Sequence, residues 1–408
     1  MEDFRAAIKE RCNLTLNMSK SKVYLASGEL PEEAPEGMER AGIQLDDRWL
    51  PGFKAYGVFI GSQDYVRHSL LQKVEGLRGE VDKVMEVLKE DSQEAWVLLS
   101  TSLSLQLDYS LTLQYPSDML EAAAAMDSRL WQALQEIAGQ PRIPRREEGL
   151  GMECVVEVPG VPGLQGKSYQ SWIVAQPVKL GGLGLRSLVE TSPAAYVGGI
   201  EQAIPHMLGQ EGKPGICPQL QEVVGRVEGE DRYQHFLAAG SQTAREFEAS
   251  WNSLAREAGE ICQVLGKEVE GPLEKEVISA GGKSSDGSTR RLVVEQRESL
   301  QHQLLSKALA EHQDRQARPV TVFPNISDDK VAGRWLLATP SQDLRMSTPV
   351  FKEAMSAHLC LPSPAVRDGG CVGKRVGGRG EVIYQFGDAV MCCKEICEDS
   401  WRRRHDGV

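Results

Sequence analysis

The stretch LLQKVEGLRGEVDKVMEVLKEDSQE, from Leu70 to Glu94, carries the clearest helical pattern in the chain. Its apolar residues recur at alternating steps of four and three, which lines one face of a helix; they are Leu70, Val74, Leu77, Val81, Val84 and Leu88. Asp91 stands three residues before Glu94, a capping pattern that predicts a second helix running to about Leu107. The stretch therefore predicts a fold built mainly from helices.

Further helices are predicted after this stretch, and a strand before it. Ser117 opens a third one, and Gly139 and Pro141 are its stop signals. Because the connections between these three helices are short, we expect an antiparallel bundle. The run from Gly52 to Ile60 predicts a strand, with Gly61 closing it. Later helices are expected at residues 193–207, 233–265 and 290–310, and a short one has Thr348 as N-cap and Pro349 at its first position.

Composition limits the class of protein. The 408 residues are 41% hydrophobic and 25% charged, which is ordinary for a globular protein. No run approaches the ~20 apolar residues that a membrane span needs, and the acidic N-terminus lacks the apolar core of a signal peptide. We therefore expect an intracellular protein, nuclear or cytoplasmic, without membrane contact. The formal net charge of -12 argues against strong non-specific binding of nucleic acid, so such binding would need a local basic site.

The expected fold class is α+β, predominantly α: small strands, then a helical bundle, then a second helical region. Changes in composition divide the chain into five regions. Residues 1–66 hold the strands, 67–140 the bundle and 141–215 a connection rich in Pro, Gly and Arg. The second helical region covers residues 216–318, and a C-terminal region with clustered cysteines covers 319–408.

No complete catalytic motif is found in the sequence. Asp46 and Asp47 lack the tight hairpin in which paired aspartates hold catalytic metals, so we interpret them as a solvated turn. The segment from Gly281 to Ser284 imitates the end of a phosphate-binding loop, but Val277 stands where that loop needs glycine. The nucleophile motif Gly-x-Ser-x-Gly is absent.

Cysteines crowd into the C-terminal region, which holds five of the nine in the chain. With nearby histidines they offer candidate ligands for a tetrahedral zinc ion, namely Cys360, Cys392, Cys397 and His405. Their spacing is irregular, and no Cys-x-x-Cys pair is present. Reduced structural cysteines are therefore the favoured interpretation, with a zinc-stabilised module as the alternative.

Four motifs, in order, give the chain a resemblance to a known family. They are LTLNMSKSK at residues 14–22, YGVFIGS at 56–62, PVKLGGLGL at 177–185 and AAYVG at 194–198. This series resembles the C-terminal part of the reverse transcriptase of LINE-type (non-LTR) retrotransposons. The segments from Gly387 to Cys392 and from Arg404 to Asp406 are similar to the Cys/His segment that ends this family's pattern, although Ala389 replaces the expected histidine.

The resemblance implies roles for particular residues. Lys20 matches a lysine positioned near the incoming triphosphate, and Gly57, Phe59 and Gly61 match the primer grip, a tight turn that supports the primer terminus. The helices from Leu70 to Gly139 match the thumb, which packs against duplex. The basic cluster beside them supplies candidate phosphate contacts at Arg142, Arg145 and Arg146.

The family's catalytic aspartates, which bind Mg²⁺, would lie upstream of Met1. We therefore expect an orphan C-terminal fragment of an RNA-directed DNA polymerase, not an enzyme, that binds RNA or DNA duplex weakly and holds no cofactor. The missing palm and fingers of such a polymerase would be its other natural partner. The alternative is a helical protein–protein interaction protein with no nucleic-acid role. Oligomeric state is not predicted.

Overall fold

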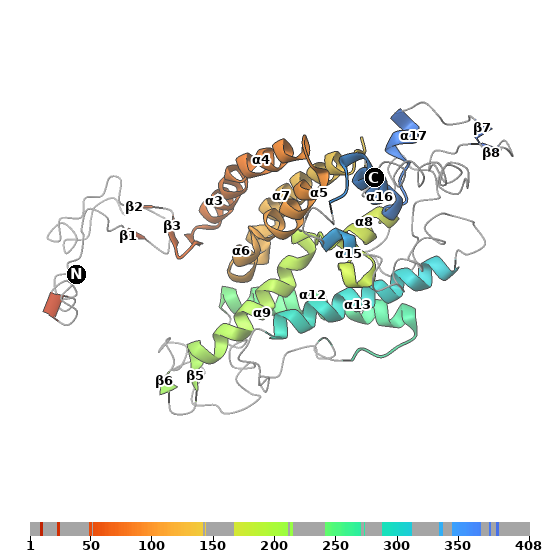
Figure 1. Ribbon diagram of the computed structural model, residues 1–408. Helices are drawn as coiled ribbons and strands as arrows, with labels where there is room; N and C mark the ends of the chain where they lie inside the picture. Colours follow the sequence, from red (N-terminus) through yellow and green to blue (C-terminus); the bar gives the residue numbers. More distant parts are fainter. Residues whose placement is uncertain are drawn as a thin grey trace.

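The computed structural model describes residues 52–141, 143, 167–210, 241–270, 273, 288–311, 334–337 and 345–368, with six two-residue pieces elsewhere. Within these residues the fold is predominantly α with small strand pairs, so the expected fold class is confirmed (Figure 1). The boundaries of the five regions stay predictions. No helix in the described part has the length and apolarity that crossing a membrane requires.

The helices are α3 (Gln63–Gly76), α4 (Arg78–Leu88), α5 (Ser92–Thr101), α6 (Asp108–Leu113), α7 (Pro116–Ile137), α8 (Tyr169–Ala175), α9 (Leu188–Leu208), α12 (Gln242–Leu265), α13 (Ser288–Glu311), α15 (Arg334–Leu337), α16 (Thr348–His358) and α17 (Pro364–Asp368). Short 3-10 helices are η2 (Leu103–Leu105) and η5 (Val178–Leu180). The strands form pairs: β1 (Val23–Tyr24) with β2 (Trp49–Leu50), β3 (Gly52–Ala55) with β4 (Val58–Gly61), β5 (Gly209–Gln210) with β6 (Lys213–Pro214), and β7 (Arg375–Val376) with β8 (Glu381–Val382).

The predicted strand from Gly52 to Ile60 is wrong, because this segment is an antiparallel hairpin. Strands β3 and β4 pair from Gly52–Gly61 to Ala55–Val58, and Tyr56 and Gly57 form the turn between them. Both turn residues have positive φ, +50° and +84°, which is the geometry of a two-residue type I′ turn. Glycine adopts a positive φ without strain, so Gly57 suits this turn, whereas the positive φ strains the backbone at Tyr56.

The first two predicted helices are shorter than their apolar pattern suggests. The first is interrupted at Leu77, between α3 and α4, where Gly76 and Gly79 flank the break and weaken the helix. The second begins as expected, since the Asp91 carboxylate accepts from the amides of Gln93 and Glu94 at 2.8 and 3.0 Å. It ends at Thr101 rather than near Leu107, and the short η2 and α6 follow it.

The bundle direction follows from contacts between α3 and α7. Arg67 near the start of α3 pairs with Asp118 near the start of α7, at 3.2 Å. Glu75 at the end of α3 pairs with Arg129, further along α7. These two helices therefore run in the same direction, as the first and third members of an up-down-up bundle do. Helix α7 begins at Pro116 and is followed by Gly139 in the left-handed region, close to the predicted bounds.

Helix α9 is the centre of the molecule. It packs against α6 and α7 on the bundle side and against α12 and α13 on the other (Figure 1). The buried apolar residues form one continuous cluster through both helical layers. Helix α9 starts at Leu188, five residues before the predicted start, while α12 starts at Gln242, nine residues after its predicted start, with Ser241 as N-cap.

The C-terminal helix α16 returns to the bundle. Its N-cap is Ser347 and not the predicted Thr348. The Thr348 hydroxyl instead accepts from the Ser92 amide at 3.3 Å, at the start of α5. Arg345 pairs with Asp91 at 2.6 Å and reinforces the same junction. The side chain of Thr348 therefore bonds to the start of α5 and does not cap α16.

Candidate functional site

The turn of the β3–β4 hairpin projects an aromatic ring into solvent. Tyr56 is 96% exposed, the largest exposure among the exposed large apolar side chains of the described residues. Its positive φ costs about 1–2 kcal/mol in a residue with a Cβ, and strained backbone of this kind gathers at functional sites. This outlier makes the hairpin tip the first candidate for a binding surface.

The hairpin is held firmly by the helices beneath it. The Gln114 side-chain amide, just after α6, donates to the Phe59 carbonyl at 3.0 Å. At the base of the hairpin, a Cβ on Gly52 would lie 2.1 Å from the ring of Tyr65, so only glycine permits this packing of β3 on α3. The tip is therefore presented on a rigid support, which reduces the entropy lost on binding.

Two lysines and a second tyrosine surround the tip. The Lys54 ammonium lies 5.5 Å from the centre of the Phe59 ring. Burial lowers the pKa of Lys73, and repulsion by the positive charge of Lys54 lowers it further. Lys73 donates to the Ser110 hydroxyl at 2.7 Å. Tyr109 is 53% exposed, and its ring borders Gly57. We call Lys54, Tyr56, Phe59, Lys73 and Tyr109 the hairpin surface.

The structure brings only part of the predicted nucleic-acid site together. Gly57 lies in the turn and Phe59 in the hairpin surface, whereas Gly61 pairs with Gly52 at the base. The other predicted contacts fall outside the described residues; they are Lys20, Arg142, Arg145 and Arg146. Sequence reasoning missed four members of the hairpin surface, Lys54, Tyr56, Lys73 and Tyr109. The Tyr-Gly pair was the available signal for a two-residue turn between alternating residues.

The described zinc candidate is a buried structural cysteine. Cys360 is 2% exposed and lies against the Tyr169 hydroxyl. Nearby His358 is also buried, and its Nε2 lies 2.9 Å from the Gly181 carbonyl, so Nε2 carries the proton. Burial lowers the pKa of His358 to about 4, although the Gly181 carbonyl acts in the opposite direction. The described residues contain no cluster of three metal-ligating side chains; Cys392, Cys397 and His405 lie outside them.

The glycine-rich segment of the PVKLGGLGL motif folds back on α8. The amides of Leu183 and Leu185 donate to the carbonyls of Ile173 and Val174, both at 2.9 Å. A Cβ on Gly182 would lie 2.1 Å from the Gln176 carbonyl oxygen, so glycine is required for this approach. The segment thus satisfies the end of α8 and directs the chain into α9.

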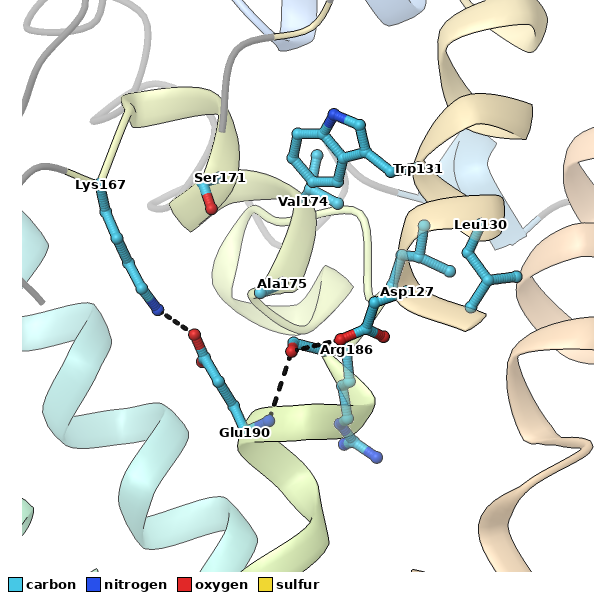
Figure 2. A pocket seen from close by; sticks show the side chains of 11 residues that line it. Asp127, Leu130, Trp131, Lys167, Ser171, Val174, Ala175, Arg186 and Glu190 are labelled. Atoms are coloured by element: carbon cyan, nitrogen blue, oxygen red, sulfur yellow. Dashed lines mark hydrogen bonds and ion pairs between the residues drawn. The ribbon is translucent and has the colours of Figure 1, made fainter. Parts of the chain in front are cut away.

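A carboxylate from α7 then caps α9. The oxygens of Asp127 accept from the Ser187 hydroxyl at 2.7 Å and from the amides of Leu188 and Val189 at 2.8 and 3.3 Å. Figure 2 shows Asp127 at the start of α9. A negative charge at a helix start is favourable because of the unpaired amides there. Asp127 therefore fixes the position of α9 relative to the bundle.

A charged network surrounds Glu190 in the first turn of α9. Glu190 pairs with Lys167 and, at 3.3 Å, with Arg297 of α13. Arg297 also binds both oxygens of Glu257 from α12, at 3.0 and 3.1 Å. Burial alone would raise the pKa of Glu190, but the charges of Lys167 and Arg297 outweigh it and hold the pKa at about 2. Glu190 is thus ionised at any physiological pH.

Beside this network lies a pocket of about 130 Å³, between α7, α8 and the start of α9 (Figure 2). Lys167, Ser171 and Glu190 line one side, and Leu130 and Trp131 line another. The sequence predicted no site here.

Comparison of the whole chain with protein families, curated proteins and solved structures finds no match in any of the three.

Proposed function

We propose that this chain binds RNA or DNA duplex weakly through the hairpin surface, as a relic of a retrotransposon polymerase with no catalytic step of its own. The observation that carries the proposal is the strained, 96% exposed Tyr56 on a rigid hairpin beside two lysines. An exposed ring can stack on a terminal base pair or an unpaired base, and lysines bind phosphate. The order of motifs in the sequence supports the polymerase origin.

The charges of the hairpin surface set the strength of binding. Lys54 and Lys73 provide two cations, and neither has a carboxylate partner within 4 Å among the described residues. Two phosphate contacts give a salt slope of about -2 in a plot of log K against log salt. The net charge of -12 repels phosphate elsewhere on the molecule. Binding should therefore be measurable at low salt and lost near physiological ionic strength.

Fluorescence anisotropy of a labelled RNA–DNA duplex, titrated with protein at about 20 mM salt, tests the proposal. We expect saturable binding that weakens severalfold in Lys54→Gln. Lys89→Gln is the matched control, because Lys89 is an exposed lysine after α4 and is not part of the hairpin surface. Absence of saturable binding, or equal effects of the two substitutions, would contradict the proposal.

A second function is favoured by exposed apolar residues on η2 and α6, one of which, Tyr109, also belongs to the hairpin surface. Leu105, Tyr109 and Leu113 follow each other at steps of four and are 53%, 53% and 39% exposed. Such a stripe is typical of a surface that another protein covers. In this reading the partner is the palm and fingers portion of the same kind of polymerase. Co-purification lost in Leu105→Glu and kept in Leu337→Glu, at an exposed leucine of α15, would support it; equal loss or no co-purification would refute it.

A further inference from the structure

The pocket between α7, α8 and α9 has a size that suits one small ring. Its volume of about 130 Å³ is close to that of the roughly 150 Å³ cavity known to hold benzene in another protein. Leu130 and Trp131 from α7 and Val174 from α8 supply an apolar wall, and Figure 2 shows them on the bundle side of α8. The size of the pocket and its apolar wall favour a ligand with a flat apolar ring.

The charges around the pocket exclude a charged ligand. Lys167 is paired with Glu190, and Arg186 is paired with Glu298 at 2.6 Å. Glu190 is further neutralised by Arg297. A charged ligand would have to compete with one of these ion pairs, and breaking a pair leaves one of its charges without a partner. The ligand should therefore be uncharged.

The carboxylate and hydroxyl groups at the pocket offer acceptors, beside the N–H donors of Lys167 and Arg186. The carboxylate of Glu190 keeps lone pairs beyond those used by its two cations, and the Ser171 hydroxyl points toward the pocket (Figure 2). The Ser187 hydroxyl donates to Asp127 and accepts from the Glu190 amide at 3.3 Å, which leaves it one lone pair. A ligand that brings an N–H or O–H donor matches these groups.

We propose that this pocket binds a small uncharged aromatic or heterocyclic compound that carries an N–H or O–H donor. The site is separate from the hairpin surface, because the two share no residue. A test of ligand binding at this pocket is therefore independent of the test of nucleic-acid binding.

Ligand-observed NMR titrations of the full chain with phenol, toluene and benzoate test the proposal. For a compound of this size we expect phenol to saturate with a Kd of about 1 mM. Toluene, which has no donor, and benzoate, which is charged, should each bind at least about fivefold more weakly, given the polar groups described above. No saturation by phenol up to about 10 mM, or benzoate binding as tightly as phenol, overturns the proposal.

Two substitutions locate the binding in this pocket. Ala175→Leu fills it and should abolish phenol binding, whereas Ala124→Leu places the same side chain on the exposed face of α7 and should leave it unchanged. Ser171→Ala adds no volume and should reduce the preference for phenol over toluene, because one of the acceptors is lost. If Ala175→Leu fails to fold, the Ser171→Ala result decides: an unchanged preference for phenol overturns the assignment. A folded Ala175→Leu that still binds phenol overturns it too.

Discussion

Replacing Tyr56 by Asn should make the protein more stable and its nucleic-acid binding weaker. Tyr56 occupies a left-handed backbone conformation, φ +50°, that costs a tyrosine about 1–2 kcal/mol. Asn tolerates this conformation, and Asn-Gly is the preferred pair for a type I′ turn. Because the ring is 96% exposed, its removal loses almost no packing. We therefore expect Tyr56→Asn to gain about 1 kcal/mol of unfolding free energy and to raise Tm by about 2 °C.

The same substitution removes the ring that we assign to base stacking. Stacking of one base on an aromatic side chain contributes about 1–3 kcal/mol, so the Kd for an RNA–DNA duplex should rise about five- to a hundredfold. Thermal unfolding followed by circular dichroism measures the first effect, and fluorescence anisotropy at low salt measures the second. Val350→Asn, at an exposed position of α16, is the control and should leave the Kd unchanged. A more stable Tyr56→Asn protein that binds duplex as tightly as the wild type would refute the reasoning.

Three further predictions concern stability. Asp127→Ala removes the cap of α9 and should lower the unfolding free energy by about 1–2 kcal/mol in denaturant titration; no change would refute the capping role. Glu190→Gln leaves Lys167 without its carboxylate, while Arg297 keeps Glu257, and should cost about 2 kcal/mol at neutral pH, so a neutral effect in the same titration would contradict the network. Folding lowers the pKa of His358 from 6.5 to about 4, so below pH 6.5 the unfolded chain takes up a proton that the folded chain does not. The free energy of unfolding is therefore unaffected above pH 6.5 and falls by about 3 kcal/mol as the pH falls toward 4. Unfolding titrations of wild type and His358→Gln between pH 7 and about pH 4 should show this extra acid sensitivity in the wild type only.

The helical part of the fold was predictable because its signals are local. The apolar spacing from Leu70 to Leu88 and the cap at Asp91 follow from neighbouring residues alone. The break at Leu77 was missed, because a periodic pattern continues across a short interruption that keeps the apolar face in line. Thr348 was wrongly predicted to be the N-cap of its helix, since its partner Ser92 is distant in the sequence.

The sites were less predictable for the same reason. The charged network beside the pocket joins residues from three helices and from the segment before α8, namely Lys167, Glu190, Glu257 and Arg297. No spacing rule connects residues so far apart in the sequence. The hairpin surface was found only in part. Gly57 and Phe59 came from a family resemblance, whereas Tyr56 became a candidate only once its positive φ was known.

The salt dependence of duplex binding tests the central claim most directly. The measurement is the slope of log K against log salt for a labelled RNA–DNA duplex, for the wild type and for Lys54→Gln. The account predicts a slope of about -2 for the wild type and about -1 for the variant, because each lysine releases about one counterion. Equal slopes for the two proteins, or a slope near zero, would contradict the assignment of binding to the hairpin surface.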